Sequence, residues 1–299
     1  GKSTLINRLV GEKVSIVTPK SQTTRERTLG VLTTDKTQLV FNDTPGVYSQ
    51  RSAKKLPAVN RDIIWDGWDV IEDTHIELVL SVVDVVKTID DEIKFVMKKL
   101  HEGKQQNIKE VADGGPKVEY LLALNKADQL KTVRTPLASI RDRFRLHIPY
   151  IDEIFDKVFY ISALNGDGVP ALKNALLDRA IPQEWMYPKE YKTGYSQLKR
   201  AAEVIREKIY KHINLEVPYY VKQRNIAWTN IDADHLLITQ DLLVPKSSQV
   251  GILVGRGKRV LDSIQDEAQR ELAVIFKKSV TLQLWVKVNK NAYLDPTLF

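Results

Sequence analysis

The chain has 299 residues, a formal net charge of +7 and no cysteine. Its length suffices for two domains with complete cores, and the lack of cysteine excludes disulfides, thiolate zinc sites and cysteine nucleophiles. No apolar run approaches the length that spans a bilayer. The charge is uneven, because residues 184–299 carry 18 Lys and Arg against 13 Asp and Glu, whereas residues 1–183 carry 27 against 25. This bias favours a polyanionic partner for the C-terminal part, although it is also typical of a solvated surface.

The chain opens with GKST at residues 1–4, followed by apolar residues at helical spacing. GKST matches the end of a phosphate-binding loop, GxxxxGK[ST], whose first residues would lie ahead of Gly1. In such a loop Gly1 lets the backbone approach phosphate, Lys2 reaches the β- and γ-phosphates, and Ser3 offers its hydroxyl to Mg²⁺. Thr4 completes the predicted nucleotide-binding segment. By itself, however, GKST is also typical of an ordinary helix N-terminus.

A second motif, DTPG, follows the apolar run at 39–41. This run predicts a buried strand that ends at Asp43, where a carboxylate can hold Mg²⁺ through water. Gly46 can turn a backbone N–H toward the γ-phosphate. The same predicted segment includes Thr44, Pro45 and Val47. The alternative is a strand followed by a Pro-Gly turn without any ligand.

The middle of the chain alternates apolar runs with helical patterns, which predicts a mostly parallel sheet covered by helices on both sides. Residues 78–83 are predicted to form a fully buried strand, and apolar residues from Ile89 to Leu100 recur at helical spacing. The polar, glycine-containing stretch 101–117 is interpreted as a surface insertion that could contact a partner.

Two further motifs, NKAD at 125–128 and SAL at 162–164, each follow a buried run. Asp128 can accept two hydrogen bonds from the guanine N1–H and N2 amino group, which adenine lacks, and Asn125 can tie loops together while Lys126 lies along the base. Ser162 and Ala163 are predicted to present backbone N–H groups to guanine O6. Because the four motifs occur in one fixed order, the set indicates binding of guanine nucleotide and Mg²⁺ far more strongly than any one of them.

The C-terminal part begins after a segment with two prolines at 182–191, interpreted as the interdomain linker. The predicted domains are 1–183 and 198–299, joined by a linker at 184–197. The second domain is predicted to contain a helix from Leu198 and a glycine-containing loop at 255–258. Its strands are expected at Tyr219–Trp228, His235–Val244 and 280–288.

These motifs resemble the Era family of GTPases. The resemblance extends through QTTRER at 22–27, DTPGV, NKAD and SALNGDG, and continues through IREK at 205–208, VPY at 217–219 and LQLWVKV at 282–288. It implies an α/β phosphate-loop GTPase domain with a mostly parallel sheet, followed by an α+β type II KH domain. It also implies hydrolysis of GTP to GDP and phosphate with Mg²⁺.

By the same resemblance, Thr24 of the switch segment at 21–28 completes the Mg²⁺ shell with Ser3 and Asp43. Val47 stands where Ras-like enzymes carry a water-orienting glutamine, and valine cannot hydrogen-bond water. Hydrolysis must therefore rely on another group, with a bound K⁺ as one candidate, and the sequence does not identify the catalytic residue.

The KH resemblance implies that single-stranded RNA binds at a GxxG loop, which here reads Gly255, Arg256, Gly257 and Lys258. Lys258 departs from the family glycine, so that it blocks part of the backbone's approach to phosphate and adds charge. The alternative is a KH fold that docks proteins.

The hypothesis is a GTPase that binds the 3′ region of small-subunit ribosomal RNA on the pre-ribosomal small subunit, together with ribosomal assembly proteins. The first alternative is a hydrolysis-deficient, GTP-responsive scaffold that holds an assembly intermediate by protein contacts. The second is a tRNA-modification GTPase, although nothing in the sequence resembles its modification machinery. The altered loop and the stretch 101–117 favour the mitochondrial matrix over the bacterial cytoplasm, which is the alternative location.

Overall fold

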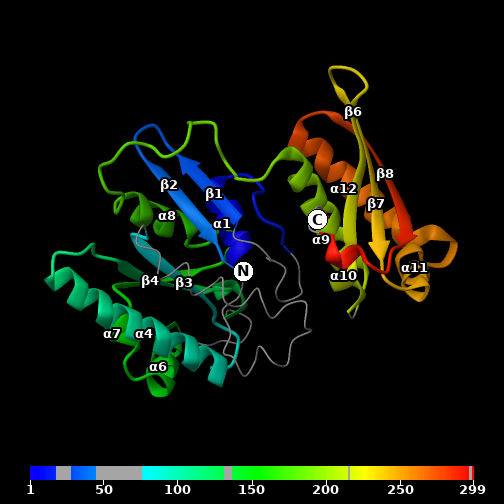
Figure 1. Ribbon diagram of the computed structural model, residues 1–299. Helices are drawn as coiled ribbons and strands as arrows, with labels where there is room; N and C mark the ends of the chain where they lie inside the picture. The colour runs from blue at the N-terminus through cyan, green and yellow to red at the C-terminus, as the bar shows by residue number, and fades with distance from the viewer. Residues whose placement is uncertain (18–27, 45–75, 131–136, 215, 296–297) are drawn as a thin grey trace. The chain divides into compact units, whose positions relative to one another are not determined.

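A computed structural model describes residues 1–17, 28–44, 76–130, 137–214, 216–295 and 298–299 (Figure 1). The described residues form two compact units. The first contains residues 1–15 and the described part of 28–193, and the second contains residues 16–17 and the described part of 194–299. No helix in the described part of the chain has the length and apolar character needed to cross a membrane.

The first unit is built on a three-stranded parallel sheet with the order β3-β4-β5. Its strands are β3 (Leu78–Asp84), β4 (Glu119–Asn125) and β5 (Lys157–Ile161). A separate antiparallel pair consists of β1 (Thr28–Thr33) and β2 (Gln38–Asp43). Because the three parallel strands end at one edge of their sheet, Asp84 and Asn125, which are aligned in the register, lie together there.

Helices cover both faces of the parallel sheet. They are α1 (Lys2–Val10), α4 (Asp91–Ala112), α6 (Leu137–His147), α7 (Ile151–Ile154) and α8 (Val169–Leu177). Leu122 and Leu124 of β4 pack against α4, α6 and α7, whereas Leu121 and Ala123 pack against α1 and α8. This layering explains why β4 is apolar at consecutive positions, as the alternating apolar runs predicted.

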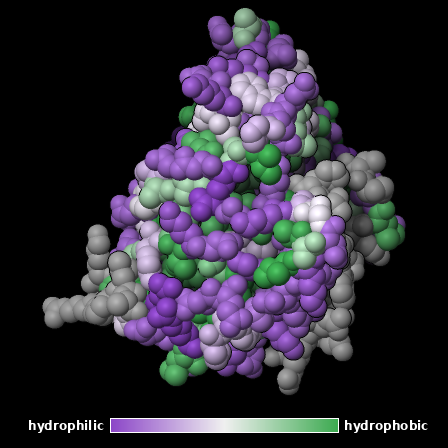
Figure 2. Space-filling model, turned by 90° about the vertical axis from the view of Figure 1, so that its left-hand side faces the viewer, coloured by the Kyte–Doolittle hydropathy of each residue, from purple (hydrophilic) through white to green (hydrophobic). Residues whose placement is uncertain are grey.

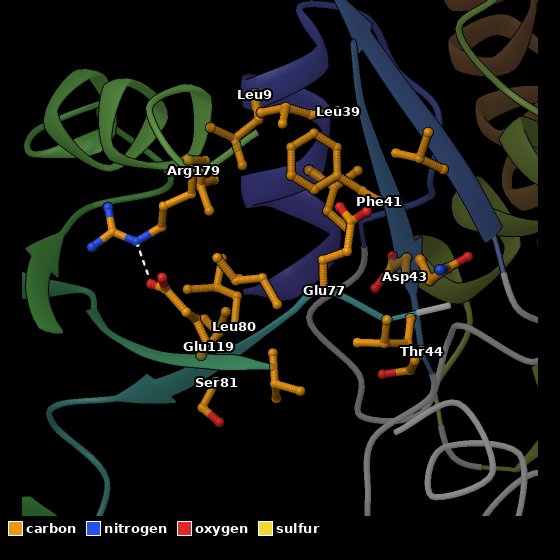
Figure 3. A pocket seen from close by; sticks show the side chains of 18 of the residues that line it. Leu9, Leu39, Phe41, Asp43, Thr44, Glu77, Leu80, Ser81, Glu119 and Arg179 are labelled. Carbon is orange, nitrogen blue, oxygen red and sulfur yellow. Dashed lines mark hydrogen bonds and ion pairs between the residues drawn. The ribbon is translucent and has the colours of Figure 1, made fainter. Parts of the chain in front are cut away.

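The structure corrects the prediction that the strand at 78–83 is fully buried. Every residue of β3 is half-buried, and side chains of β3 and β2 line a common pocket. Leu39 and Phe41 of β2 line it on one side and Leu80 of β3 on the other (Figure 3). Among the described strands, β2 pairs with β1 alone and β3 with β4 alone. The apolar run therefore identified the strand but not its exposure.

The stretch 101–117 is likewise corrected, because α4 continues through it as far as Ala112. Asn107, near the end of the helix, is buried, and its side chain donates to Pro116 O at 2.9 Å and accepts from Val118 N at 2.9 Å. These bonds fold the end of the helix back toward β4. Gly103 lowers the helical propensity of this stretch, but the glutamine, lysine and glutamate residues around it are good helix formers, so the helix continues.

Residues 187–193 run beside β1 and β2. Lys192 O accepts from Val31 N at 2.9 Å, Thr193 bridges to Gly30, and Gln38 Nε2 donates to Tyr187 O at 2.9 Å. Part of the segment interpreted as a linker is thus hydrogen-bonded to the first unit. The following helix, α9 (Gln197–His212), begins at Ser196, whose side chain accepts from Lys199 N.

The second unit contains a mixed sheet with the order β6-β7-β8. Its elements are α9, α10 (Val217–Tyr220), β6 (Lys222–Asn230), β7 (His235–Val244), α11 (Ser247–Val254), α12 (Arg259–Phe276) and β8 (Ser279–Val288). Core residues of α9 and α12 pack on one face of this sheet. β6 and β7 are antiparallel, and β7 and β8 are parallel.

The outer edge of β8 is bonded to α12. The side-chain oxygens of Gln265 and Gln269 accept from the backbone N–H groups of Leu284 at 3.1 Å and Leu282 at 2.9 Å. These N–H groups alternate along β8 with those that face β7. Side chains of one helix therefore satisfy backbone donors of the strand that follows it.

Candidate functional site

The phosphate-binding segment forms the N-terminus of α1. Lys2 is the first helical residue, and Leu5 N donates to Gly1 O at 3.0 Å. Leu5 and Leu9 are buried in the core that α1 shares with β4 and α8. This packing fixes the direction of the helix, whose N-terminal N–H groups and dipole favour an anion beside Gly1 and Lys2.

Asp43 lies at the end of β2 and is 1% exposed. Its Oδ2 accepts from the Ser3 hydroxyl at 2.8 Å and from the Ser15 hydroxyl at 2.7 Å. Its other oxygen, Oδ1, is buried and has no hydrogen-bond partner within the described residues. Such an oxygen is costly to bury, so it suits a cation or a cation-bound water.

The residues present fit Mg²⁺. A magnesium ion in a nucleotide site takes one or two protein oxygens and completes its shell with water and phosphate. Ser3 and Asp43 supply a hydroxyl and a carboxylate within hydrogen-bond distance of each other. The described residues contain no cluster of three or more His, Cys, Asp and Glu that could hold a metal ion.

Lys2 lies close to this carboxylate. Burial lowers the pKa of the Lys2 ammonium below its usual range, and the negative charge of Asp43 opposes that shift. Lys2 is half-buried, and a partly desolvated cation beside a helix N-terminus gains from a phosphate that would pair with it. The electrostatics of this end of α1 therefore favour a polyanion.

The cavity between β2 and β3 reaches this phosphate end (Figure 3). Lys2, Asp43 and Thr44 lie at one end, and the Arg179–Glu119 ion pair, with 2.7 Å between Nε and Oε2, lies at the other. Between them the walls are mainly apolar side chains of the two strands. On the side of the first unit that carries α4, α7 and α8, apolar side chains also show between hydrophilic ones (Figure 2). The end at Lys2 combines a positive charge with the N-terminus of α1, which suits phosphate.

NKAD lies at the end of β4, where Asn125 is 4% exposed. Its Oδ1 accepts from Lys126 N at 2.8 Å and from Ala163 N at 2.9 Å. Its Nδ2 approaches Gly1 so closely that a Cβ on Gly1 would lie 3.1 Å from it. Asn125 thus brings together the phosphate-binding segment, NKAD and SAL.

Lys126 and Asp128 lie at the open end of the sheet. The backbone of Lys126 is left-handed, with φ of 66°, and its Nζ is 2.5 Å from Asp84 Oδ2. Asp128 is half-buried in the single turn Ala127–Gln129. The ammonium of Lys126 is thus held by Asp84, while contact of its aliphatic part with the base stays a prediction.

The SAL segment opens a loop that runs from the end of β5 to α8. Ser162 N donates to Asp167 O at 2.8 Å, and Ala163 N donates to Asn125. Both N–H groups predicted to meet guanine O6 are therefore engaged within the protein. The N–H of Leu164 makes no hydrogen bond to the described residues. Which of the three meets the base remains a prediction.

The predicted RNA loop lies between α11 and α12. Gly255 ends α11, and residues 256–258 form one turn before α12 begins at Arg259. Lys258 adopts φ of 64°, a left-handed conformation that suits the family glycine better than lysine, and its Nζ lies 3.1 Å from Asp262 Oδ1. Exposed Arg256 and Lys258 thus stand at the N-terminus of α12, where the helix dipole also favours phosphate.

Several predicted site residues lie outside the described residues. They are Thr24 with the rest of the switch segment as far as Arg27, and Pro45, Gly46 and Val47. Thr4 and Thr44 are described, Thr4 within α1 and Thr44 just after β2. Sequence reasoning missed Ser15, which belongs to no motif and is recognisable only from its bond to Asp43.

Comparisons with known proteins cover both units. Residues 1–126 match the family model described as 50S ribosome-binding GTPase, and residues 216–292 match that of the KH domain. The chain is 33% identical over 298 residues to GTPase Era of Bradyrhizobium sp. (strain ORS 278), covering 99% of this chain and 88% of that protein. It is 32% identical over 300 residues to GTPase Era of Sinorhizobium medicae (strain WSM419), covering 100% of this chain and 88% of that protein.

Two solved structures resemble the whole chain. The first is Era in complex with MgGDPNP and nucleotides 1506–1542 of 16S ribosomal RNA, with a TM-score of 0.77, 28% identity, and coverage of 99% of this chain and 92% of that one. The second is a single-residue variant of Aquifex aeolicus Era bound to GDP·AlF4⁻, with a TM-score of 0.76, 27% identity, and coverage of 97% and 90%.

Proposed function

The chain belongs to the Era family of GTPases, and from this premise we propose that it hydrolyses GTP and binds small-subunit ribosomal RNA. The observation that carries the proposal is the likeness over 99% of the chain to an Era structure that holds both MgGDPNP and 16S ribosomal RNA. The description of the first family model mentions the 50S subunit, but that model covers residues 1–126 alone. The whole-chain likeness therefore decides in favour of the small subunit.

In this proposal the nucleotide lies across the open ends of α1, β2 and β4. Lys2 and the N-terminus of α1 bind the phosphates, with Gly1 and Thr4 in the same segment. Asp128 selects guanine, and Asn125 holds the loops around it while Lys126 lies along the base. The further contacts proposed are Thr44, Pro45, Gly46 and Val47 at the γ-phosphate, and Ser162 and Ala163 near guanine O6.

Ser3, Asp43 and Thr24 are proposed to hold Mg²⁺, which when bound neutralises charge on the β- and γ-phosphates. Ser15 keeps the Asp43 carboxylate in place by donating to Oδ2, which leaves Oδ1 for the ion or its water. Lys2 stabilises the charge that accumulates on the phosphoryl oxygens during transfer. Val47 supplies no hydrogen bond to the attacking water, so another group must orient it, and a bound K⁺ is our candidate.

The second unit is proposed to bind RNA at residues 255–258. Arg256 and Lys258 contact phosphates there, and the N-terminus of α12 adds its dipole. We retain residues 1–183 as the GTPase domain, 184–197 as the linker and 198–299 as the KH domain. Pre-ribosomal small subunits and their assembly proteins are the proposed partners. Because the curated relatives compared above are bacterial, the mitochondrial expectation has no support, and we propose the bacterial cytoplasm instead.

The test uses the purified full chain, GTP with Mg²⁺, and an RNA with the sequence of nucleotides 1506–1542 of 16S ribosomal RNA. We expect release of one phosphate per GTP, and binding of this RNA in preference to the same RNA in scrambled order. Binding without phosphate release would favour the scaffold alternative, which the apolar Val47 makes worth testing. If the chain neither binds this RNA nor releases phosphate from GTP, the proposed function is overturned.

A further inference from the structure

Arg8 of α1 lies beside the loop that follows β5, across a sequence separation of 155 residues. Its Nε donates to Ala163 O at 2.8 Å, and its Nη2 donates to Leu164 O. We propose that Arg8 is a positioning residue for guanine recognition, which orients the Ala163–Leu164 peptide so that the N–H of Leu164 is presented to guanine O6. This inference rests on the proposed GTP binding.

The geometry of a trans peptide carries the argument. The C=O of residue 163 and the N–H of residue 164 belong to one planar unit and point in opposite directions. Because Arg8 binds the carbonyl of Ala163, the N–H of Leu164 must point away from the guanidinium. That N–H makes no hydrogen bond to the described residues, whereas those of Ser162 and Ala163 are engaged. Leu164 therefore has the donor that remains available to a ligand.

The arginine binds two successive carbonyl groups at once. A guanidinium is a planar fork whose donors keep fixed relative positions, so it restrains two peptide planes together, which an ammonium cannot do. The second of these two peptides is held at its N–H as well, because Asn165 N donates to Ser162 Oγ at 3.1 Å. Arg8 is thus the side chain by which α1 holds this loop in place.

The loop is shaped to admit the guanidinium. Gly166 has φ of 99°, and a Cβ at this position would lie 2.7 Å from Arg8 Nη1. A side chain at residue 166 would therefore strain the backbone and displace the arginine. Asn125 holds the same loop from its other side, by accepting from Ala163 N. The helix that begins at the phosphates consequently also sets the position of the base loop.

The experiment measures the affinity of the full chain for GTP, ITP, ATP and tripolyphosphate, and follows GTP turnover. ITP keeps O6 but lacks the N2 amino group, ATP carries an amino group at C6, and tripolyphosphate reports the phosphate end alone. For Arg8→Met we expect a loss of about tenfold in affinity for both GTP and ITP, the effect of about one hydrogen bond to a charged donor. The preference for GTP over ATP should fall, whereas tripolyphosphate affinity and the kcat for GTP should stay unchanged.

Three further variants complete the test. Arg8→Lys, which keeps the charge and one donor, should lose less GTP affinity than Arg8→Met. Gly166→Ala should reproduce the Arg8→Met pattern. Arg141→Met, which removes an exposed arginine that pairs with Asp152, is the matched control and should change none of the affinities.

Equal losses for GTP and tripolyphosphate would assign Arg8 to the phosphate end and overturn the inference, as would unchanged GTP affinity in Arg8→Met. If Arg8→Met does not fold, Arg8→Lys and Gly166→Ala decide by the same comparison of the losses in affinity for GTP and for tripolyphosphate. Failure of the wild-type chain to bind GTP would overturn the proposed function and this inference with it. Wild-type binding with unaffected variants would overturn the inference alone.

Discussion

Replacement of Lys258 by glycine should stabilise the second unit, although it removes an ion pair. Lysine in the left-handed region costs roughly 1–2 kcal/mol, and replacement by glycine removes this cost. Glycine in turn lowers stability by about 0.5–1 kcal/mol, because it gives the unfolded chain more conformational freedom. The contact with Asp262 contributes at most about 0.5 kcal/mol, because both side chains are half-exposed. Lys258→Ala removes the charge but keeps the strained backbone. We therefore expect Lys258→Gly to exceed Lys258→Ala in unfolding free energy by about 0.5–1 kcal/mol.

Calorimetry of the full-length variants measures this difference. For a unit of about 100 residues it corresponds to a rise in Tm of about 2–8 °C. Lys258→Asn, whose side chain tolerates the left-handed region, should fall between the other two. Binding of single-stranded RNA distinguishes the charge of Lys258 from the approach of the backbone to phosphate. Lys258→Ala and Lys258→Gly both remove the charge and should reduce the salt slope of RNA affinity by about 0.7. Only Lys258→Gly should restore close contact between the backbone and phosphate. Equal Tm values for the alanine and glycine variants would refute the strain argument, and an unchanged salt slope would refute the phosphate contact.

The remaining predictions concern the nucleotide site and the sheet of the second unit. Asp128→Asn should weaken GTP binding about ten- to a hundredfold and favour xanthosine triphosphate, because a charged acceptor facing the base is lost; unchanged preference in a competition assay would remove Asp128 from the base contact. Lys2→Ala should abolish phosphate release, whereas Val47→Ala should change it little; loss of turnover in Val47→Ala with normal nucleotide affinity would reveal a role for this side chain. Burial opposes ionisation of Asp241, but its hydrogen bonds with Arg224 and Lys287 prevail and lower the pKa of this carboxyl below its usual 3.8. The contribution of ionised Asp241 to the free energy of unfolding is therefore complete above pH 3.8 and is lost as the pH falls through the lowered pKa. Asp241→Asn should therefore flatten the acid side of the profile of unfolding free energy against pH, measured by denaturant unfolding. An unaltered profile would contradict this role of Asp241.

The sequence predicted those parts of the molecule whose residues act locally. β7 begins and ends where the sequence predicted a strand, at His235 and Val244. The structure brings Ser3 and Asp43, 40 residues apart, within hydrogen-bond distance of each other, while their role in holding magnesium stays a prediction. Each of these predictions depends on a motif or a period that neighbouring residues define.

The features that were missed depend on residues distant in the chain. Ser15 and Arg8 matter through bonds to Asp43 and to the loop after β5, and neither belongs to a recognisable motif. The half-buried state of every residue of β3 is likewise not revealed by a run of apolar letters. Lys258 was identified as a departure from the family glycine, but only the backbone shows that it adopts the conformation that glycine would.

The glutamine bonds between α12 and β8 have a mechanical consequence. Gln265 and Gln269 lie one turn apart, and each is bonded to a different backbone N–H of β8, so α12 cannot slide along the strand without breaking both bonds. Arg256 and Lys258 lie in the turn that leads directly into this helix. A force that a bound polyanion exerts on residues 255–258 would therefore be transmitted to the sheet as well as to the helix. Because the two donors are occupied, this edge is also closed at these positions to an incoming strand from another chain.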